Sequence, residues 1–171
     1  LKSQEVLSEP FRNKIGQLNN FYIPISKKIN ESYIKDQRIK IIGLTGGQGS
    51  GKSTISSILK IILKYGFNLN TVNFSIDDFY KTYAERKKMS KNVSPLFLTR
   101  GVPGTHDTKL LYECLRKLKS SNFRKMLIPK FDKSRDDRSP KKNWQIINKK
   151  PNIVIFEGWC IGVRPQKKKD L

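Results

Sequence analysis

The sequence contains little of what a membrane, secreted or metal-cluster protein needs. Its 171 residues include two cysteines and no apolar run near the ~20 residues that cross a bilayer. The first five residues, LKSQE, lack the apolar segment of a signal peptide. Cys114 and Cys160 have neither metal-ligand spacing nor the density of a disulfide framework. We therefore expect reduced thiols, no membrane partner and a cytoplasmic location.

Acidic residues are scarce as well. The 14 Asp and Glu are outnumbered by 35 Lys and Arg, which gives a formal net charge of +21. Such a charge favours anionic partners in general, including nucleotides, nucleic acid and acidic membrane surfaces. The basic residues are scattered, however, with only short clusters such as those at residues 86–88, 141–142 and 167–169. This pattern predicts a solvated surface and no specific nucleic-acid partner, with nucleic-acid binding as the alternative.

The sequence does contain a strand, a glycine-rich turn and a helix in succession. Residues 39–44 are an apolar, isoleucine-rich run, and residues 54–65 carry apolar side chains at helical spacing. The turn between them fits G-x-x-x-x-G-K-[ST], the phosphate-binding P-loop. Its backbone N–H groups and the following helix N-terminus suit the phosphates of a nucleotide. The expected nucleotide-binding residues are Gly46, Gly47, Gln48, Gly49, Ser50, Gly51, Lys52, Ser53 and Thr54.

Two side chains of this loop have specific expected roles. The Lys52 ammonium is placed to neutralise the β- and γ-phosphates, and the Ser53 hydroxyl to hold Mg²⁺. A flexible Gly/Ser loop would match the same pattern. The strand before it and the helix after it favour the P-loop.

Carboxylates follow two further β-prone runs. Asp77 and Asp78 come after residues 71–76, and Glu157 comes after the apolar run at residues 152–156. Ligands bind at the carboxyl ends of strands in α/β sheets. Glu157 is therefore a candidate for ordering Mg²⁺, and the aspartates for a catalytic carboxylate beside an attacking hydroxyl. A helix cap is the alternative for the aspartates, and a solvent-facing strand end for Glu157.

The remaining elements alternate in the same way. The pattern predicts two helical pieces within residues 10–35, separated at residues 22–24, with Pro24 in the first turn of the second piece. It also predicts that Gly66 caps the C-terminus of the P-loop helix. Residues 82–92 are helical or irregular, residues 100–107 are a loop, and residues 108–120 form an amphipathic helix capped by Asp107 or Thr108. A fourth strand is expected at residues 126–131, and residues 132–143 are too charged to be buried.

Strands that alternate with helices predict an α/β fold with a mainly parallel sheet. The length suits one compact domain, residues 1–171. Within it we expect an N-terminal helical segment at residues 1–37, followed by a nucleotide- and substrate-binding core at residues 38–171.

Five segments together resemble a known family. In order they are GLTGGQGSGKST, SIDDFY, RGVPGTHD, IPKFDKSRDDR and IFEGWCIG. The sequence from about Phe21 onward resembles the D-glycerate 3-kinase family, P-loop kinases related to uridine kinase, phosphoribulokinase and pantothenate kinase. The resemblance implies a P-loop three-layer α/β sandwich that uses ATP and Mg²⁺. It also implies phosphoryl transfer to a hydroxyl of a small anionic metabolite, D-glycerate above all.

The resemblance also implies roles for individual residues. Asp77 matches the base that faces the substrate hydroxyl in uridine kinases, and Asp78 would be a carboxylate on the magnesium side or behind the base. Asp132 and Arg138 keep the spacing of a substrate-binding Asp and Arg. Phe131 stands where uridine kinases have tyrosine, so a contact made by that phenol is lost.

A hydroxy-acid substrate also suits the chemistry of these residues. Arg100, His106 and Arg138 offer donors for a carboxylate, and a guanidinium can bind one through two hydrogen bonds. His106 is the single histidine, with a surface-loop position as its alternative. Asp107 is a helix cap or a substrate ligand. Trp159 and Cys160 are expected to pack behind the strand that ends at Glu157.

Related kinases continue well beyond that strand, with a further strand, a base pocket and a lid. For the chain as given we therefore expect a fold truncated at its C-terminus, weak base discrimination, slow turnover and a tendency to aggregate. Alternative functions are a kinase of the uridine or pantothenate type and a non-catalytic nucleotide-binding switch. The acceptor-side loops and Asp77 favour the enzyme, since a switch does not need them.

Overall fold

The computed structural model describes residues 13–164, which fall into two compact units. The outer unit contains the chain up to Asn73 and from Asn152 onward, and the inserted unit is Phe74–Pro151. The expected helix start at residues 10–12 and the lysine cluster at residues 167–169 lie outside the described residues.

The outer unit begins with a helical segment that has no break. It comprises α1 (Lys14–Gln17), the π-helical turn η2 (Leu18–Tyr22) and α2 (Ile23–Ile34). Pro24 lies in the first turn of α2, as predicted, but the predicted separation at residues 22–24 is wrong. The wider turn of η2 explains this, because a π-turn can precede a proline without ending the helical path.

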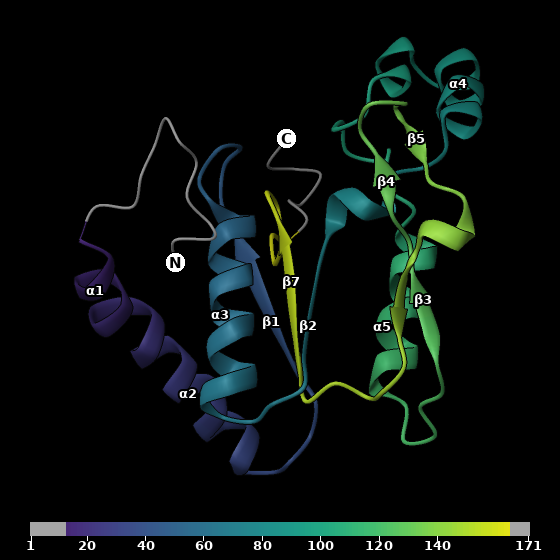
Figure 1. Ribbon diagram of the computed structural model, residues 1–171. Coiled ribbons are helices and arrows are strands. Elements are labelled where there is room, and N and C mark those ends of the chain that lie inside the picture. The colour runs from purple at the N-terminus through teal and green to yellow at the C-terminus, as the bar shows by residue number, and fades with distance from the viewer. Residues whose placement is uncertain (1–12, 165–171) are drawn as a thin grey trace. The chain divides into compact units, whose positions relative to one another are not determined.

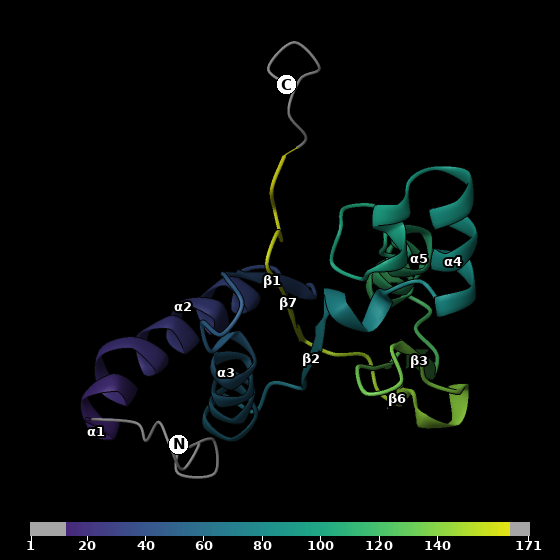
Figure 2. The ribbon, with the colours of Figure 1, turned by 90° about the horizontal axis from the view of Figure 1, so that it is seen from above.

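A three-stranded sheet carries the P-loop. Its strand order is β1 (Lys40–Thr45), β7 (Ile153–Gly158) and β2 (Thr71–Ser75), and β1 pairs with β7 in parallel. The helix α3 (Lys52–Gly66) follows the loop and lies on the same side of β1 and β7 as α2 (Figures 1 and 2). The sequence-derived α/β architecture with a parallel pair of strands is confirmed.

The core of the outer unit lies between these helices and one face of the sheet. Its buried side chains are Tyr22, Ile29, Ile58, Leu59, Leu63, Leu69, Ile153 and Ile155. The buried positions on α3 follow the helical period that the sequence predicted. This packing holds the start of α3, which carries Ser53, against the end of β7, which carries Glu157. The predicted cap at Gly66 is wrong, since Gly66 is still helical and Phe67 is the cap.

The inserted unit consists of short elements. After β2 come η3 (Ile76–Phe79), α4 (Tyr83–Asn92), η4 (Pro95–Leu98) and α5 (Thr108–Lys119). Two antiparallel pairs follow: β3 (Met126–Ile128) with β6 (Gln145–Ile147), and β4 (Phe131–Asp132) with β5 (Asp137–Arg138). The turn η5 (Lys141–Asn143) precedes β6. The β4–β5 hairpin lies beside α4 and η4 (Figure 1).

The structure corrects the predicted strands of this unit. The single strand expected at residues 126–131 is divided at Pro129 and Lys130 into β3 and β4, and neither β5 nor β6 was predicted. These strands have two or three residues, too few to show an alternating pattern in the sequence. As predicted, residues 132–143 contain no buried side chain.

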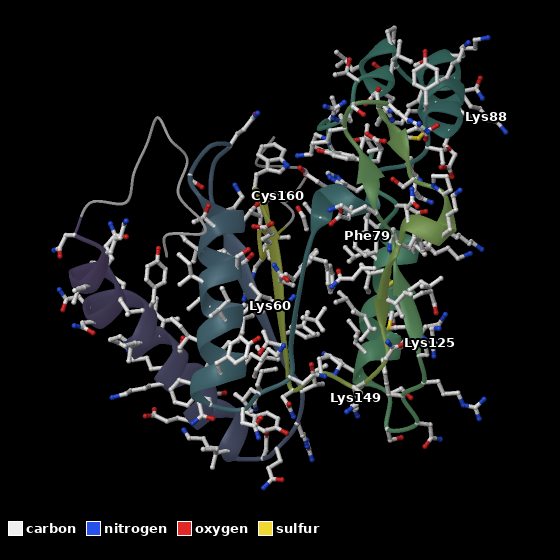
Figure 3. The ribbon with its side chains drawn as sticks, in the orientation of Figure 1. Lys60, Phe79, Lys88, Lys125, Lys149 and Cys160 are labelled. Carbon is white, nitrogen blue, oxygen red and sulfur yellow. The ribbon has the colours of Figure 1, made fainter. Side chains whose placement is uncertain are left out.

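Most basic side chains are exposed, as the scattered charge predicted. Lys88 of α4 and Lys125, for example, extend away from the backbone (Figure 3). Arg86 is the exception among residues 86–88, because it is fully buried. Cys114 and Cys160 are free thiols, and burial raises the pKa of Cys114 to about 11. Within residues 13–164, every helix falls short of the length and apolarity needed to span a bilayer.

Candidate functional site: a P-loop and an acidic turn

The P-loop of the outer unit turns sharply between β1 and α3. Gly49 and Gly51 have φ angles of 76° and 77°, in the left-handed region that side chains other than glycine rarely adopt. Three donors meet the Gly47 carbonyl: the Ser50 N–H at 3.3 Å, the Ser50 hydroxyl at 2.8 Å and Lys52 Nζ at 2.5 Å. The lysine therefore lies over the loop, close to where the phosphates of a nucleotide would bind.

The structure brings Ser53 and Glu157 together at the base of this loop. The Ser53 hydroxyl donates to Glu157 Oε1 at 2.9 Å, across 104 positions of sequence. Glu157 is buried, and its Oε2 has no hydrogen-bond partner among the described residues. A buried carboxylate oxygen of this kind is costly unless a cation or donor meets it. This hydroxyl–carboxylate pair fits Mg²⁺, which prefers oxygen ligands and keeps several waters and phosphates.

Beyond Glu157 the structure corrects a prediction. Trp159 is 52% exposed and Cys160 is only partly buried, so neither packs behind β7. The reason is that β7 ends at Gly158 and the chain turns immediately afterwards. The Trp159 carbonyl accepts a hydrogen bond from the Thr45 hydroxyl at 3.2 Å, which ties this turn to the end of β1. An indole is thus exposed next to the P-loop strand.

In the inserted unit, Asp77 and Asp78 have different environments. Asp78 is buried and closes a capping box with Ser75, whose N–H donates to Asp78 Oδ2 at 3.3 Å. Its other oxygen accepts from the Phe131 N–H at 3.4 Å and pairs with Lys130 at 3.0 Å. Both oxygens of Asp78 are therefore engaged within its own unit. Asp78 has the capping role that the sequence left open.

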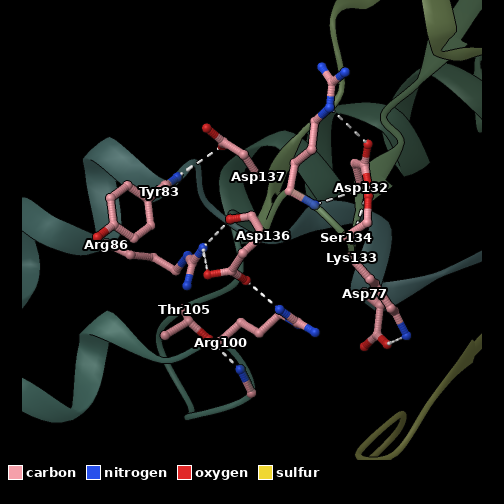
Figure 4. Close-up of polar contacts among 12 residues, drawn as sticks. Asp77, Tyr83, Arg86, Arg100, Thr105, Asp132, Lys133, Ser134, Asp136 and Asp137 are labelled. Atoms are coloured by element: carbon pink, nitrogen blue, oxygen red, sulfur yellow. Dashed lines mark hydrogen bonds and ion pairs between the residues drawn. The ribbon is translucent and has the colours of Figure 1, made fainter.

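Asp77 is the more accessible of the two carboxylates, with a side chain 31% exposed. Its Oδ2 accepts from Lys133 Nζ at 2.9 Å, an ion pair visible in Figure 4. Lys133 lies in the turn between β4 and β5. Sequence reasoning missed both Lys130 and Lys133, because neither the spacing nor the charge of a lysine says which carboxylate it will meet.

Arg138 and Asp107 contact one another. Arg138 donates from Nε and Nη2 to the Tyr80 carbonyl, at 3.3 and 2.8 Å, and from Nη2 to Asp107 Oδ2 at 3.1 Å. Asp107 Oδ1 accepts from the Leu110 N–H at 3.0 Å and so caps α5. The structure gives Asp107 its predicted capping role and gives Arg138 internal partners.

Arg100 is also paired internally. Its guanidinium forms a short ion pair with Asp136 Oδ1, and Arg86 Nη2 donates to Asp136 Oδ2 at 2.9 Å (Figure 4). Arg86 donates further to the carbonyls of Lys81, Leu98 and Asp136. Burial disfavours the charge of Asp136, but the hydrogen bonds from Arg100 and Arg86 outweigh it and lower the Asp136 pKa. These arginines join α4 and η4 to the hairpin.

Asp132 stabilises the hairpin turn itself. Its Oδ1 accepts from the Ser134 hydroxyl at 2.5 Å, the Ser134 N–H at 2.9 Å and the Arg135 N–H at 3.3 Å (Figure 4). The bond from the Ser134 hydroxyl is the main cause of a lowered Asp132 pKa. The turn that carries Lys133 is therefore held in a defined conformation.

His106 differs from the other predicted acceptor-side residues. Its backbone forms an isolated antiparallel bridge with Tyr80, and its ring stacks on the Tyr80 ring with centroids 4.3 Å apart. It is only 7% exposed, and its Nε2 has no hydrogen-bond partner among the described residues. Burial lowers the His106 pKa, opposed by the negative charge of Asp77. The lowered pKa favours a neutral imidazole.

The predicted residues thus fall into two groups. The P-loop, Ser53 and Glu157 lie together in the outer unit. The acceptor-side residues Asp77, Asp78, Arg100, His106, Asp107, Asp132 and Arg138 all belong to the inserted unit. Sequence reasoning missed Arg86, which it assigned to the solvated surface, and the lysine partners of the two aspartates.

Comparison with known proteins identifies relatives for both groups. The model of the Phosphoribulokinase / Uridine kinase family matches residues 41–165. An uncharacterized kinase of Schizosaccharomyces pombe, mug58, is 41% identical over 132 residues, which cover 73% of this chain and 47% of that protein. The chloroplastic D-glycerate 3-kinase of Arabidopsis thaliana is 33% identical over 168 residues, with coverage of 88% and 36%.

A solved structure is similar as well. The D-glycerate 3-kinase from Cryptococcus neoformans superposes with a TM-score of 0.73 at 32% identity, over 94% of this chain and 57% of that one. The chain spans about half the length of the curated relatives it matches, or less. These matches confirm the resemblance to D-glycerate 3-kinases and their kinase relatives. Because the family model matches residues in both units, the chain belongs to the Phosphoribulokinase / Uridine kinase family.

Proposed function

We propose that this protein transfers the γ-phosphoryl group of ATP to a hydroxyl of a small anionic metabolite, with D-glycerate as the acceptor. The observation that carries the proposal is the contact of Ser53 with Glu157 beside the P-loop, in which one buried oxygen of Glu157 has no partner among residues 13–164. A magnesium–nucleotide site uses a P-loop hydroxyl together with a nearby carboxylate, whereas a flexible Gly/Ser loop would not bring the two together. The D-glycerate 3-kinases among its relatives support the choice of acceptor.

The residues of the outer unit would act on the donor. A phosphate oxygen would replace the Gly47 carbonyl as the partner of Lys52, and the loop N–H groups would surround the β-phosphate. Ser53 and Glu157 would hold Mg²⁺, which neutralises charge on the phosphates when it is bound. We propose that both units work as a single kinase domain, since the family match covers residues in each.

The inserted unit would act on the acceptor. Asp77 takes the proton of the attacking hydroxyl as the new O–P bond forms and the bond from the γ-phosphorus to ADP breaks. Asp78 supports Asp77 indirectly, because its capping box fixes the turn that carries both. Arg138 and Asp107 position the backbone of Tyr80 and the start of α5.

A coupled assay of ADP release tests the proposal. D-glycerate, pantothenate, uridine and ribulose 5-phosphate are compared as acceptors, each with ATP and Mg²⁺, and the Lys52→Ala variant is the blank. We expect D-glycerate to give the highest kcat/KM, with product phosphate on a carbon-bound hydroxyl by ³¹P NMR. A preference for uridine, or equal ATP hydrolysis with and without acceptor, would reject the proposed function.

A further inference from the structure

An acid acceptor needs a cation on the acceptor side, and the two predicted arginines are engaged elsewhere. Arg100 pairs with Asp136, and Arg138 donates to the Tyr80 carbonyl and Asp107. Both sets of contacts hold the inserted unit together, so redirecting either guanidinium would disturb its fold. The carboxylate of the acceptor must therefore find another positive charge near Asp77.

Lys133 offers a positive charge in direct contact with Asp77. Its Nζ lies 2.9 Å from Asp77 Oδ2, and its side chain is 64% exposed. The turn below it is fixed by the three hydrogen bonds that Asp132 Oδ1 accepts. The Lys133 ammonium thus lies at the end of a flexible four-carbon side chain, whose backbone is fixed by the turn. An exposed ion pair is weak, so a substrate carboxylate can compete with Asp77 for it.

We propose that Lys133 is the residue that recognises the acceptor's carboxylate, and that it keeps Asp77 paired until an acid acceptor binds. This inference rests on the proposed function and deepens it by naming the group that selects an acid over a neutral alcohol. When the carboxylate takes over Lys133, Asp77 Oδ2 becomes available to accept the proton of the acceptor's hydroxyl. Binding of an acid acceptor and the freeing of Asp77 from Lys133 then occur in the same step.

The dimensions of a three-carbon acid agree with this arrangement. Its terminal hydroxyl and carboxylate oxygens lie on the order of 5 Å apart, from ordinary bond lengths. One hydrogen bond of about 3 Å from each end reaches two groups as close as Asp77 and Lys133. The negative charge of Asp77 acts on the His106 ring, and His106 Nε2, which has no partner in the described part of the chain, offers a contact for a second hydroxyl.

Steady-state kinetics of the full chain with D-glycerate and its neutral amide, D-glyceramide, test the proposal. The matched control is Lys130→Met, since Lys130 is similarly exposed and pairs with the neighbouring aspartate. For Lys133→Met we expect the preference for D-glycerate over D-glyceramide, as a ratio of kcat/KM, to fall on the order of 10- to 100-fold. Lys133→Arg should restore part of it, and Lys130→Met should leave the ratio unchanged.

Other outcomes would overturn the inference. Lys133 does not recognise the carboxylate if the kcat/KM ratio of the two acceptors is unchanged in Lys133→Met, or if kcat/KM falls equally for both. The same conclusion follows if Lys130→Met lowers the ratio as much as Lys133→Met does. Calorimetric binding of D-glycerate separates this failure from failure of the proposed function. Binding without transfer that still depends on Lys133 would reject the kinase alone, whereas a chain that neither binds nor phosphorylates D-glycerate would reject both.

Discussion

At the scale of single residues, Asp77 and Asp78 show how local contacts give two adjacent carboxylates different environments. Asp78 is buried, with both oxygens engaged by Ser75, Phe131 and Lys130. Asp77 is more exposed and pairs with the exposed Lys133. A carboxylate that must accept a proton during a reaction has to be reachable by substrate, which Asp77 satisfies. The sequence predicted both residues after β2 but could not tell them apart, since a capping residue and the proposed base are of the same residue type.

Replacement of Asp77 tests this division of roles. Asp77→Asn keeps the shape of the side chain and removes the base, so kcat should fall about 10²- to 10⁴-fold, the usual contribution of a general base. Affinity for magnesium–ATP, measured by calorimetry, should change little because the phosphate-binding residues are elsewhere in the chain. A large loss of nucleotide binding would instead assign Asp77 to the metal.

The titration of His106 is a second test at this scale. Burial lowers its pKa, and as the single histidine it gives one imidazole signal in NMR spectra. We expect a midpoint below the ordinary value of about 6.5. As the pH falls below that value the unfolded chain takes up the proton first, so the folded state loses stability until the pH passes the folded pKa.

Chemical denaturation between pH 7 and pH 5 measures this effect. The wild-type chain should lose more stability over that interval than His106→Asn, which has no imidazole to titrate. A midpoint at or above the ordinary histidine value, or equal pH dependence in the two chains, would contradict the buried neutral imidazole.

At the scale of elements, the predictions succeeded where stability is local and failed where it is not. The strand, loop and helix of the P-loop have their own periodicity and glycine pattern, so the sequence located them within one or two residues. The strands β4 and β5 have no such pattern. They are held by distant partners, with Asp78 accepting from the Phe131 N–H and Asp137 accepting from the Tyr83 N–H at 2.9 Å. Only the folded chain brings these partners together.

Arg86 links α4 to η4 and to the hairpin turn, and this link leads to a prediction about stability. Its fully buried guanidinium satisfies three carbonyls and one carboxylate. Arg86→Met leaves these acceptors unpaired, so the free energy of unfolding should fall by about 3 kcal/mol. Lys87→Met, one position along α4 and exposed, should change it by less than about 0.5 kcal/mol.

Urea denaturation of the two variants makes the comparison. Equal effects at the two positions would mean that the buried arginine contributes no more than a surface lysine. A large effect of Lys87→Met would contradict the assignment of that side chain to the solvated surface.

At the scale of the whole molecule, the predicted residues divide between two units that come from interleaved parts of the chain. The residues predicted to bind phosphate lie on the outer unit, and the residues predicted to act on the acceptor lie on the inserted unit. The sequence predicted the membership of each group by motif. It could not predict that Arg100 and Arg138 would be engaged internally, because any nearby carboxylate or carbonyl satisfies a guanidinium as well as a ligand does.

The net charge of +21 belongs to the molecule as a whole and leads to the final prediction. Exposed lysines such as Lys88, in α4, and Lys125, just before β3, lie in separate parts of the chain (Figure 3). A diffuse charge of this kind attracts phosphates without reading bases. Fluorescence anisotropy with labelled duplex and single-stranded oligonucleotides should therefore detect binding at 50 mM salt that weakens by about 10³-fold or more at 200 mM. Oligonucleotides of different sequence should bind alike, and D-glycerate should not compete with them. Sequence-selective binding that persists at physiological salt would contradict the solvated-surface interpretation and favour a nucleic-acid partner.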